Sequence, residues 1–394
     1  MHTRKFKRLV FVIEALNAVA TSYYGCYLFF LLRDRHGFGN LGNLAVTAGH
    51  GLIFTLAAWQ GGRFAQRFGY LTALKAGLGG MTFFLALGTA FPALAGTLLT
   101  LAGWTVAMCF TWAPLEALTS EGEDDRTLPR QLGIYNVVWA GCGALTYFFG
   151  GALFEGLGAA SVFWLPALIH AAALGLVCWM ERAPGMTAPA SPVAAAPLHQ
   201  PDPAAFAQPV NPKTFLRMAW LANPFAYIGI NTVLAVIPAL AKTLGLSTAQ
   251  AGWFCSVWAF ARLATFATLW HWTGWHYRFR WLLAAFVCLI LGFVTLVLSH
   301  HLGLLVLAQI VFGFAIGLIY YSSLFYSMDV GDTKGEHGGL HEAMIGAGIC
   351  LGPAVGATSL YLVPGSLNVG TYAVTALLAG GLAGLISLRL RGAR

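Results

Sequence analysis

The segment Val257–Thr268 reads VWAFARLATFAT. Its Arg262 is the only lysine, arginine, aspartate or glutamate between Lys242 and Arg278. The rest of the chain is similarly apolar, because 58% of its 394 residues are hydrophobic and only 9% are charged. Soluble domains carry roughly a quarter charged residues, and the mean hydropathy here is +0.72. The composition therefore predicts a membrane protein that holds an arginine inside the membrane.

Uncharged or nearly uncharged runs of about 18 to 25 residues recur along the chain, each long enough to cross a hydrocarbon core as a helix. We expect twelve spans, near residues 9–32, 43–61, 71–91, 94–117, 132–154, 159–180, 215–241, 248–271, 281–299, 302–327, 340–362 and 369–389. The short connections 91–94 and 299–302 indicate helical hairpins, because irregular backbone in lipid would leave its amide groups unsatisfied. The expected fold class is an all-α membrane protein.

Basic residues are distributed unevenly between the two ends of these spans. If the N-terminus is cytoplasmic, only Arg33, Arg35 and Lys242 fall outside. The basic residues on the cytoplasmic side are then Arg4, Lys5, Lys7, Arg8, Arg63, Arg67, Arg126, Arg130, Arg182, Lys213, Arg217, Arg278, Arg280, Lys334, Arg389, Arg391 and Arg394. By the positive-inside rule we expect both termini in the cytoplasm of a multi-pass protein in the cell (inner) membrane. The net charge of +8 then reports topology and requires no nucleic-acid partner.

A proline-rich segment separates the sixth and seventh spans. Residues 181–212 contain eight of the 16 prolines, a composition typical of an extended linker. We therefore expect an N-terminal six-helix bundle (1–180), a cytoplasmic linker (181–213) and a C-terminal six-helix bundle (214–394). The halves match weakly when shifted by about 205 residues, which aligns Asn17 with Asn223. In folds with two such repeats, the solute site lies near mid-membrane between the halves.

The loop between the second and third spans, Gly62–Tyr70, reads GRFAQRFGY and resembles the G-x-x-x-D-R-x-G-R signature of the major facilitator superfamily. Gln66 stands where that family usually has aspartate, and Tyr70 where it has a basic residue. An uncharged glutamine cannot form the gate ion pair that the family usually makes through this aspartate. The segment Gly348–Gly356 (GICLGPAVG) is similar to a glycine- and proline-rich pattern that the family's antiporters carry in the fifth span. The resemblance covers essentially the whole chain. It implies a twelve-helix fold with two pseudo-symmetric six-helix bundles.

The same resemblance implies that the first, fourth, seventh and tenth spans line the cavity, while the eighth packs against the fifth across the interface. Arg262 is near the middle of the eighth span, where a buried arginine costs about 2.5–3.5 kcal/mol and needs a partner. Glu14, well inside the first span, is the expected partner, either directly or through the solute. Two alternatives remain: a permanent Glu14–Arg262 pair that pins the halves together, or an Arg262 satisfied by backbone carbonyls.

Proton coupling is assigned to Glu14 and to His50 of the second span, because an imidazole can accept a proton near neutral pH. A role for His50 as hydrogen-bonding glue between helices remains open. Aromatic and amide side chains on the cavity helices suit a moderately polar organic solute, although the aromatic residues also suit an interfacial belt. The expected binding residues besides Glu14, His50 and Arg262 are Asn17, Tyr23, Tyr24, Trp112, Asn223, Tyr227, Asn231, Tyr320 and Tyr321.

The start of the eleventh span reads GEHGGLHE over residues 335–342. We expect Glu336 and Glu342 to face Arg63 or Arg67 in a closed inner gate, because carboxylates are favoured at helix N-termini. The complete expected gate set is Arg63, Gln66, Arg67, Glu116, Glu336, His341 and Glu342. His337 and His341 are four residues apart with Glu342 adjacent, but spacing fixes no further ligand and two glycines intervene, so we assign no metal site.

Enzymatic and ATP-driven functions find no support in the sequence. It contains no phosphate-binding Gly-x-x-x-x-Gly-Lys-Ser/Thr loop and no Gly-x-Ser-x-Gly elbow, so no cofactor and no catalysis are expected. We interpret the chain as a monomeric secondary transporter in the lipid bilayer that moves a small organic solute by proton-coupled efflux (antiport). A proton-coupled or facilitative uptake carrier is the alternative. A non-transporting membrane receptor with the same fold also remains open.

Overall fold

The computed structural model describes residues 4–123, 127–183, 211–330, 334–366 and 368–391. Within these residues the regular structure is entirely helical. The first half contains α1 (Arg4–His36), α2 (Asn40–Phe68), α3 (Tyr70–Ala90), α4 (Leu94–Met108), α5 (Trp112–Ser120), α6 (Leu128–Leu157) and α7 (Ser161–Arg182). The second half contains α8 (Pro212–Thr243), α9 (Thr248–Cys255), α10 (Val257–His271), α11 (Phe279–Leu298), α12 (Leu302–Val330), α13 (Lys334–Leu362) and α14 (Val369–Arg391).

Two of the predicted spans are broken helices. In the described residues, 11 stretches are long and apolar enough to cross a membrane, with α4 and α5 counted together over Leu94–Ser120. The twelfth passage consists of α9 and α10, which meet at Ser256. The predicted fold class is therefore confirmed. The break in the fourth span lies at residues 109–111, where Thr111 Oγ1 donates a 2.7 Å hydrogen bond to the Met108 carbonyl.

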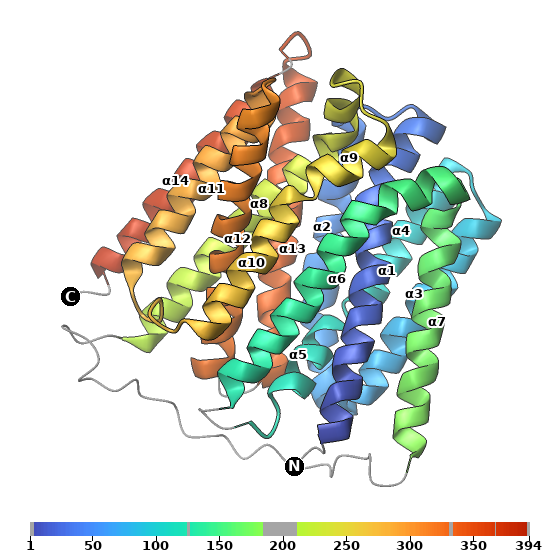
Figure 1. Ribbon diagram of the computed structural model, residues 1–394, viewed down its shortest axis with the longest axis vertical. Helices are drawn as coiled ribbons and strands as arrows, with labels where there is room; N and C mark the ends of the chain where they lie inside the picture. Colours follow the sequence, from blue (N-terminus) through green and yellow to red (C-terminus); the bar gives the residue numbers. More distant parts are fainter. Residues whose placement is uncertain (1–3, 124–126, 184–210, 331–333, 367, 392–394) are drawn as a thin grey trace.

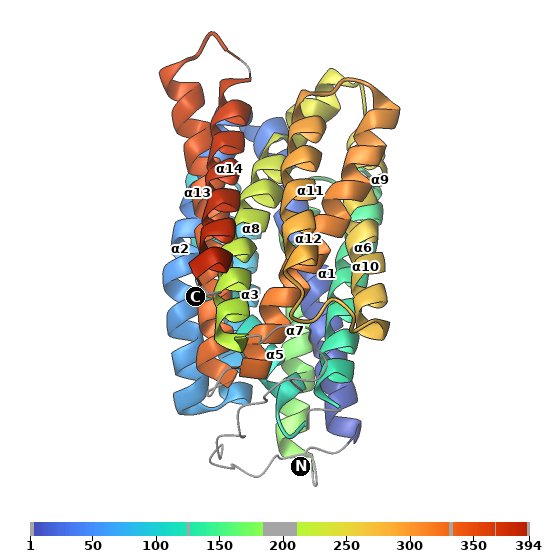
Figure 2. The ribbon, with the colours of Figure 1, turned by 90° about the vertical axis from the view of Figure 1, so that its left-hand side faces the viewer.

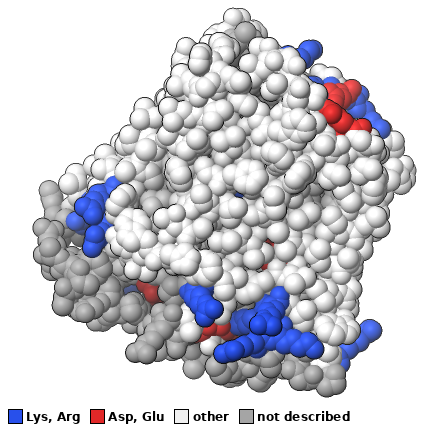
Figure 3. Space-filling model, in the orientation of Figure 1, with Lys and Arg blue, Asp and Glu red and all other residues white. Residues whose placement is uncertain are grey.

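The two halves of the chain lie side by side (Figure 1). Across their interface α2 runs along α13, and α6 runs along α9 and α10. Figure 2 shows the same bundle turned by 90°, with α2, α13 and α14 at one edge and α6 and α10 toward the other. We call the side on which α1 begins the N-terminal side. A broad middle band of the visible face is almost free of charge, and lysine and arginine gather near its lower edge (Figure 3).

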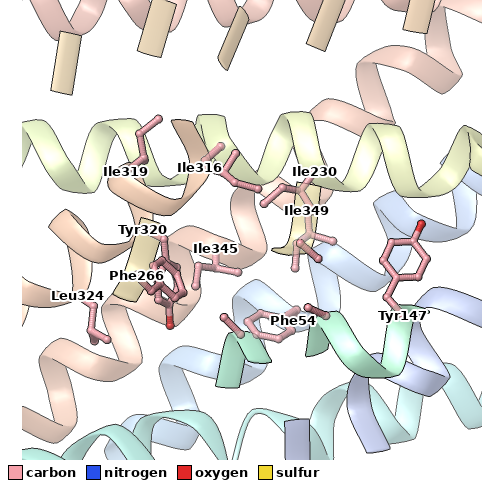
Figure 4. Packing of buried hydrophobic residues seen from close by; sticks show 14 of the residues in the cluster. Phe54, Tyr147, Ile230, Phe266, Ile316, Ile319, Tyr320, Leu324, Ile345 and Ile349 are labelled. Carbon is pink, nitrogen blue, oxygen red and sulfur yellow. The ribbon is translucent and has the colours of Figure 1, made fainter. Parts of the chain in front are cut away.

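Glycines allow the two halves to approach closely. A methyl group on Gly51 of α2 would overlap the backbone of Cys350 on α13, and one on Gly151 of α6 would overlap Thr248 on α9. Around the first contact, Phe54 of α2 lies against the α13 face that carries Ile345 and Ile349 (Figure 4). Small residues are what close helix packing in membranes requires.

Replacing Gly51 with alanine should destabilise the protein, because its methyl group would force α2 away from α13. Overpacking of this kind costs about 1–3 kcal/mol. Gly49 on the same helix is the matched control, since its substitution meets open space. Thermal unfolding in detergent measures both variants. Equal melting temperatures for Gly51→Ala and Gly49→Ala would contradict the close contact.

Candidate functional site

A cavity of about 200 Å³ lies between the two halves. Its walls come from the second half of α1, the beginning of α2 and parts of α4, α6, α8, α10 and α13, together with Trp112. The polar wall residues are Thr21, Ser22, Thr47, His50, Asn231 and Arg262, and the aromatic ones include Trp104, Trp112, Trp139, Tyr147, Tyr227 and Trp258. Because α1 enters the cavity only from Thr21 onward, the cavity lies in the half of the bundle away from the N-terminal side.

Arg262 is the only aspartate, glutamate, lysine or arginine among the described residues that line this cavity. It is 8% exposed, and its guanidinium carbon lies 4.4 Å from the ring centre of Trp139 and 5.0 Å from that of Trp258. A desolvated cation–π contact contributes about 2 kcal/mol. Two such contacts are therefore together as large as the roughly 2.5–3.5 kcal/mol that an arginine at mid-membrane costs.

Glu14 does not form the direct ion pair with Arg262 that the sequence favoured. Glu14 is completely buried, and neither of its carboxylate oxygens has a hydrogen-bond partner in the described structure. It lies within electrostatic range of Glu342 instead. Glu14 is too far along α1 to reach the cavity in which Arg262 lies. It precedes Thr21, the nearest α1 residue of the cavity wall, by seven residues, or about 10 Å along the helix axis.

Five residues assigned to solute binding from the sequence lie at the cavity wall. Besides Arg262 they are His50, Trp112, Tyr227 and Asn231. His50 Nδ1 is 2.7 Å from Thr105 Oγ1, and its ring stacks on Trp104 with centroids 6.1 Å apart. Asn231 Nδ2 donates to the Tyr227 carbonyl at 3.1 Å. His50 therefore has one ring nitrogen held by a neighbouring helix.

Other residues assigned to solute binding lie outside the cavity lining. The first-half residues make contacts within their own bundle: Asn17 Nδ2 with Thr111 Oγ1 (3.4 Å), the Tyr23 hydroxyl with Ser161 Oγ (2.6 Å), and the Tyr24 ring with Trp104 (4.6 Å between centroids).

The remaining three belong to the second half. Asn223 is completely buried. Tyr320 lies against Phe266 (Figure 4), with ring centroids 5.7 Å apart, and stacks on Trp139 at 4.8 Å. The Tyr321 ring lies 5.6 Å from that of Trp275. These side chains therefore build the packing behind the cavity wall.

Three residues of the expected gate come together on the N-terminal side of the cavity. Glu116 of α5 and His341 and Glu342 of α13 are all buried, and each offers one ligand-type atom within 4.8 Å of the others. The carboxyl groups of Glu116 and Glu342 lie close to each other, and neither oxygen of Glu116 has a hydrogen-bond partner among the described residues. Ser323 Oγ lies 2.9 Å from His341 Nδ1. This cluster connects the first half to the second.

The expected contact of Glu342 with Arg63 or Arg67 is wrong. Both arginines are exposed and lie over rings of their own helix, Arg63 over Trp59 at 4.4 Å and Arg67 over Phe68 at 5.2 Å. Glu342 is in the third turn of α13, on the face toward α5, where it meets Glu116. Glu336 belongs to the expected gate, and His337 to the histidine pair to which no metal was assigned. The side chains of both residues lie outside the described part of the chain.

Gln66, at the signature position usually held by aspartate, is exposed and accepts a 3.2 Å hydrogen bond from the Tyr70 hydroxyl. The two residues that depart from the signature therefore contact each other.

Lys7 is a functional candidate that the sequence analysis missed. Its ammonium group is buried and donates to the carbonyls of Leu118, Thr119 and Glu121 at 2.8–2.9 Å, with Glu123 Oε1 at 3.2 Å. These carbonyls lie at the C-terminal end of α5, where a cation is favoured by the helix dipole. Lys7 thus fixes the end of the short helix that carries Glu116.

The two indoles beside Arg262 were also missed. Trp258 precedes Arg262 by four residues and therefore lies on the same helix face, a spacing that the sequence does display. Trp139 comes from α6, 123 positions earlier, and no local pattern reveals that contact.

Residues 10–353 match the family model described as "Major Facilitator Superfamily". A comparison with curated protein sequences gave no match. Among solved structures, the human organic anion transporter MFSD10 (TETRAN) is similar at a TM-score of 0.71 and 15% identity, covering 98% of this chain and 99% of that one. A mutant of the nucleoside transporter NupG is similar at a TM-score of 0.68 and 15% identity, with the same coverage. At this identity the two structures establish a common fold.

A double-mutant cycle measures the contact between Arg262 and Trp139. The single variants Arg262→Met and Trp139→Leu and their combination should show a coupling free energy of unfolding of about 0.5–2 kcal/mol, because each single variant already removes the cation–π contact. The same cycle with Trp104→Leu is the control, since Trp104 lines the cavity without stacking on Arg262. No difference between the two couplings would argue against the contact.

Proposed function

The chain belongs to the Major Facilitator Superfamily and is a secondary transporter, and we propose that it moves a small organic solute bearing an anionic group by alternating access. The observation that carries this proposal is Arg262, whose guanidinium lines the cavity between the halves while no described carboxylate lines it. A solute anion is the partner that a partly desolvated guanidinium lacks. The indoles and Tyr227 suit a flat apolar body attached to that anion.

The volume of the cavity limits the solute. About 200 Å³ is below the roughly 300–1,000 Å³ typical of pockets for drug-sized ligands, so a small solute is favoured in this conformation. Binding between the two bundles suits alternating access, because a solute held by both Arg262 of the second half and Ser22 or Thr47 of the first responds to their relative movement.

We further propose that the transporter works as a proton-coupled efflux antiporter, with Glu14 and His50 as the coupling groups. The unpartnered Glu14 carboxyl and the cavity-facing His50 support this assignment. Uptake with protons, facilitated uptake and a non-transporting receptor are the alternatives. We place the protein as a monomer in the cell (inner) membrane with both termini cytoplasmic. We keep the domain limits 1–180, 181–213 and 214–394.

Replacing Arg262 with glutamine should abolish selectivity for anions. The probes are small aromatic carboxylates such as benzoate and indole-3-acetate, each paired with its neutral primary amide, and thermal stabilisation of the purified protein measures binding. Carboxylates that stabilise the wild type should bind Arg262→Gln roughly tenfold or more weakly, because a buried charge pair is lost. Arg280 is the matched control: its guanidinium carbon lies 5.4 Å from the ring centre of Trp281, and it does not line the cavity. Stabilisation by the amides as strong as by the carboxylates would refute the anion proposal.

An imposed pH gradient tests coupling and direction. In proteoliposomes, antiport predicts that a solute identified by stabilisation leaves the compartment of higher pH when the opposite side is acidic, and that His50→Gln slows this movement. Accumulation in the direction of the proton gradient would instead establish symport, and insensitivity to the gradient would establish facilitated transport. Absence of solute movement under all gradients would favour the receptor.

A further inference from the structure

The cluster of Glu116, His341 and Glu342 is not part of the solute cavity. None of the three lines the cavity, and all three are at least nine-tenths buried. Glu116 belongs to the first half and the other two to the second, so the cluster lies across the interface. Two carboxylates and an imidazole from two packed helices are a donor set that metal sites use.

The cluster has unused bonding capacity. Among the described residues, both oxygens of Glu116 and the Nε2 atom of His341 have no hydrogen-bond partner. The nearby Glu14 is likewise buried with both oxygens unpartnered. Among the side chains that the structure describes, no lysine or arginine forms an ion pair with these glutamates; the pairs present are Lys7–Glu123, Arg33–Asp34 and Lys75–Glu181. Buried carboxylates remain ionised when they are paired with a cation or coordinate a metal.

We propose that Glu116, His341 and Glu342 form a binding site for a divalent transition-metal ion of the Mn²⁺ or Zn²⁺ type. Two ionised carboxylates neutralise the charge of a divalent ion, which makes the complex compatible with a buried interface. The imidazole favours a transition metal over Mg²⁺ or Ca²⁺, which prefer oxygen ligands alone.

The geometry needs only small adjustments. Three ligands at about 2.0–2.2 Å from one ion lie roughly 3.3–3.8 Å from one another, against the present limit of 4.8 Å, so side-chain shifts of up to about 1 Å bring them together. The Ser323 hydroxyl already holds His341 Nδ1 at 2.9 Å, which leaves Nε2 to bind the ion. Ligating histidines are usually fixed in this way by a bond to the other ring nitrogen. Glu14 is within electrostatic range and adds negative potential.

A metal ion at this position would join the two halves on the N-terminal side. Its ligands come from α5 and α13, which separate when that side opens in an alternating-access cycle. Bound metal therefore stabilises the conformation described here, in which the cavity lies toward the opposite side. The site is independent of the solute assignment, since it shares no residue with the cavity.

Titration of the full-length, tag-free, chelator-treated protein with Mn²⁺ tests the proposal, with free Mn²⁺ followed by electron paramagnetic resonance and Zn²⁺ as a competitor. We expect one saturable site that Zn²⁺ displaces and Mg²⁺ does not. Glu116→Gln, Glu342→Gln and His341→Asn should each weaken Mn²⁺ binding at least tenfold. The controls are Glu155→Gln, a carboxylate at the far end of α6, and His170→Asn, a buried histidine of α7, and both should bind as the wild type does.

The metal-binding results decide between a bridging site, a site within one half and no site. No saturable Mn²⁺ or Zn²⁺ binding by the folded wild type would overturn the proposal, as would unchanged binding by the three cluster variants. Loss of binding in His341→Asn and Glu342→Gln with full retention in Glu116→Gln would refute the bridge between the halves. Thermal unfolding without metal verifies that each variant is folded. None of these measurements uses the solute, so failure of the transport proposal would leave them unaffected.

Discussion

The cost of keeping one guanidinium inside a membrane protein constrains the whole arrangement around the cavity. Among the residues that the structure describes, no carboxylate lines the cavity beside Arg262, so its charge must be met by polarisable ring faces and by a space that water or a solute can enter. Trp258 comes from the same helix, but Trp139 comes from α6 in the other half. The stability of Arg262 therefore depends on the contact between halves, and that contact depends on helices that approach closely enough.

Close approach is supplied by glycine, and closure by polar contacts on the N-terminal side. Gly51 and Gly151 remove the side chains that would hold α2 from α13 and α6 from α9. Lys7 fixes the end of α5, and α5 presents Glu116 to Glu342 of the opposite half. The molecule thus combines a cavity lined by Arg262 toward one side with a closely packed layer around Glu116 and Glu342 on the N-terminal side. This asymmetry is what one state of an alternating-access transporter requires.

Hydropathy was sufficient to predict twelve passages, because a span of apolar residues has few alternatives in a membrane. It did not reveal the breaks at residues 109–111 and at Ser256, where side-chain hydrogen bonds and local turns replace helix. The residues of the candidate functional site were harder to predict from the sequence. His50 and Asn231 were found because polar residues within spans are conspicuous, whereas Glu14 was misjudged as a direct partner because sequence gives depth only approximately. Tyr23 and Tyr320 were assigned to the cavity from helix identity alone, which does not specify the face that each side chain occupies.

Native Cys26 offers the most direct measurement of the central claim, that the Arg262 charge faces a water-filled space between the halves. Cys26 lines the cavity within electrostatic range of Arg262. In a variant that keeps only this cysteine, an anionic membrane-impermeant methanethiosulfonate should react faster than a cationic one, each relative to its rate with a free thiol. Arg262→Gln should remove that preference. Failure of both reagents to modify Cys26 from either side, or faster reaction of the cationic reagent, would contradict the account.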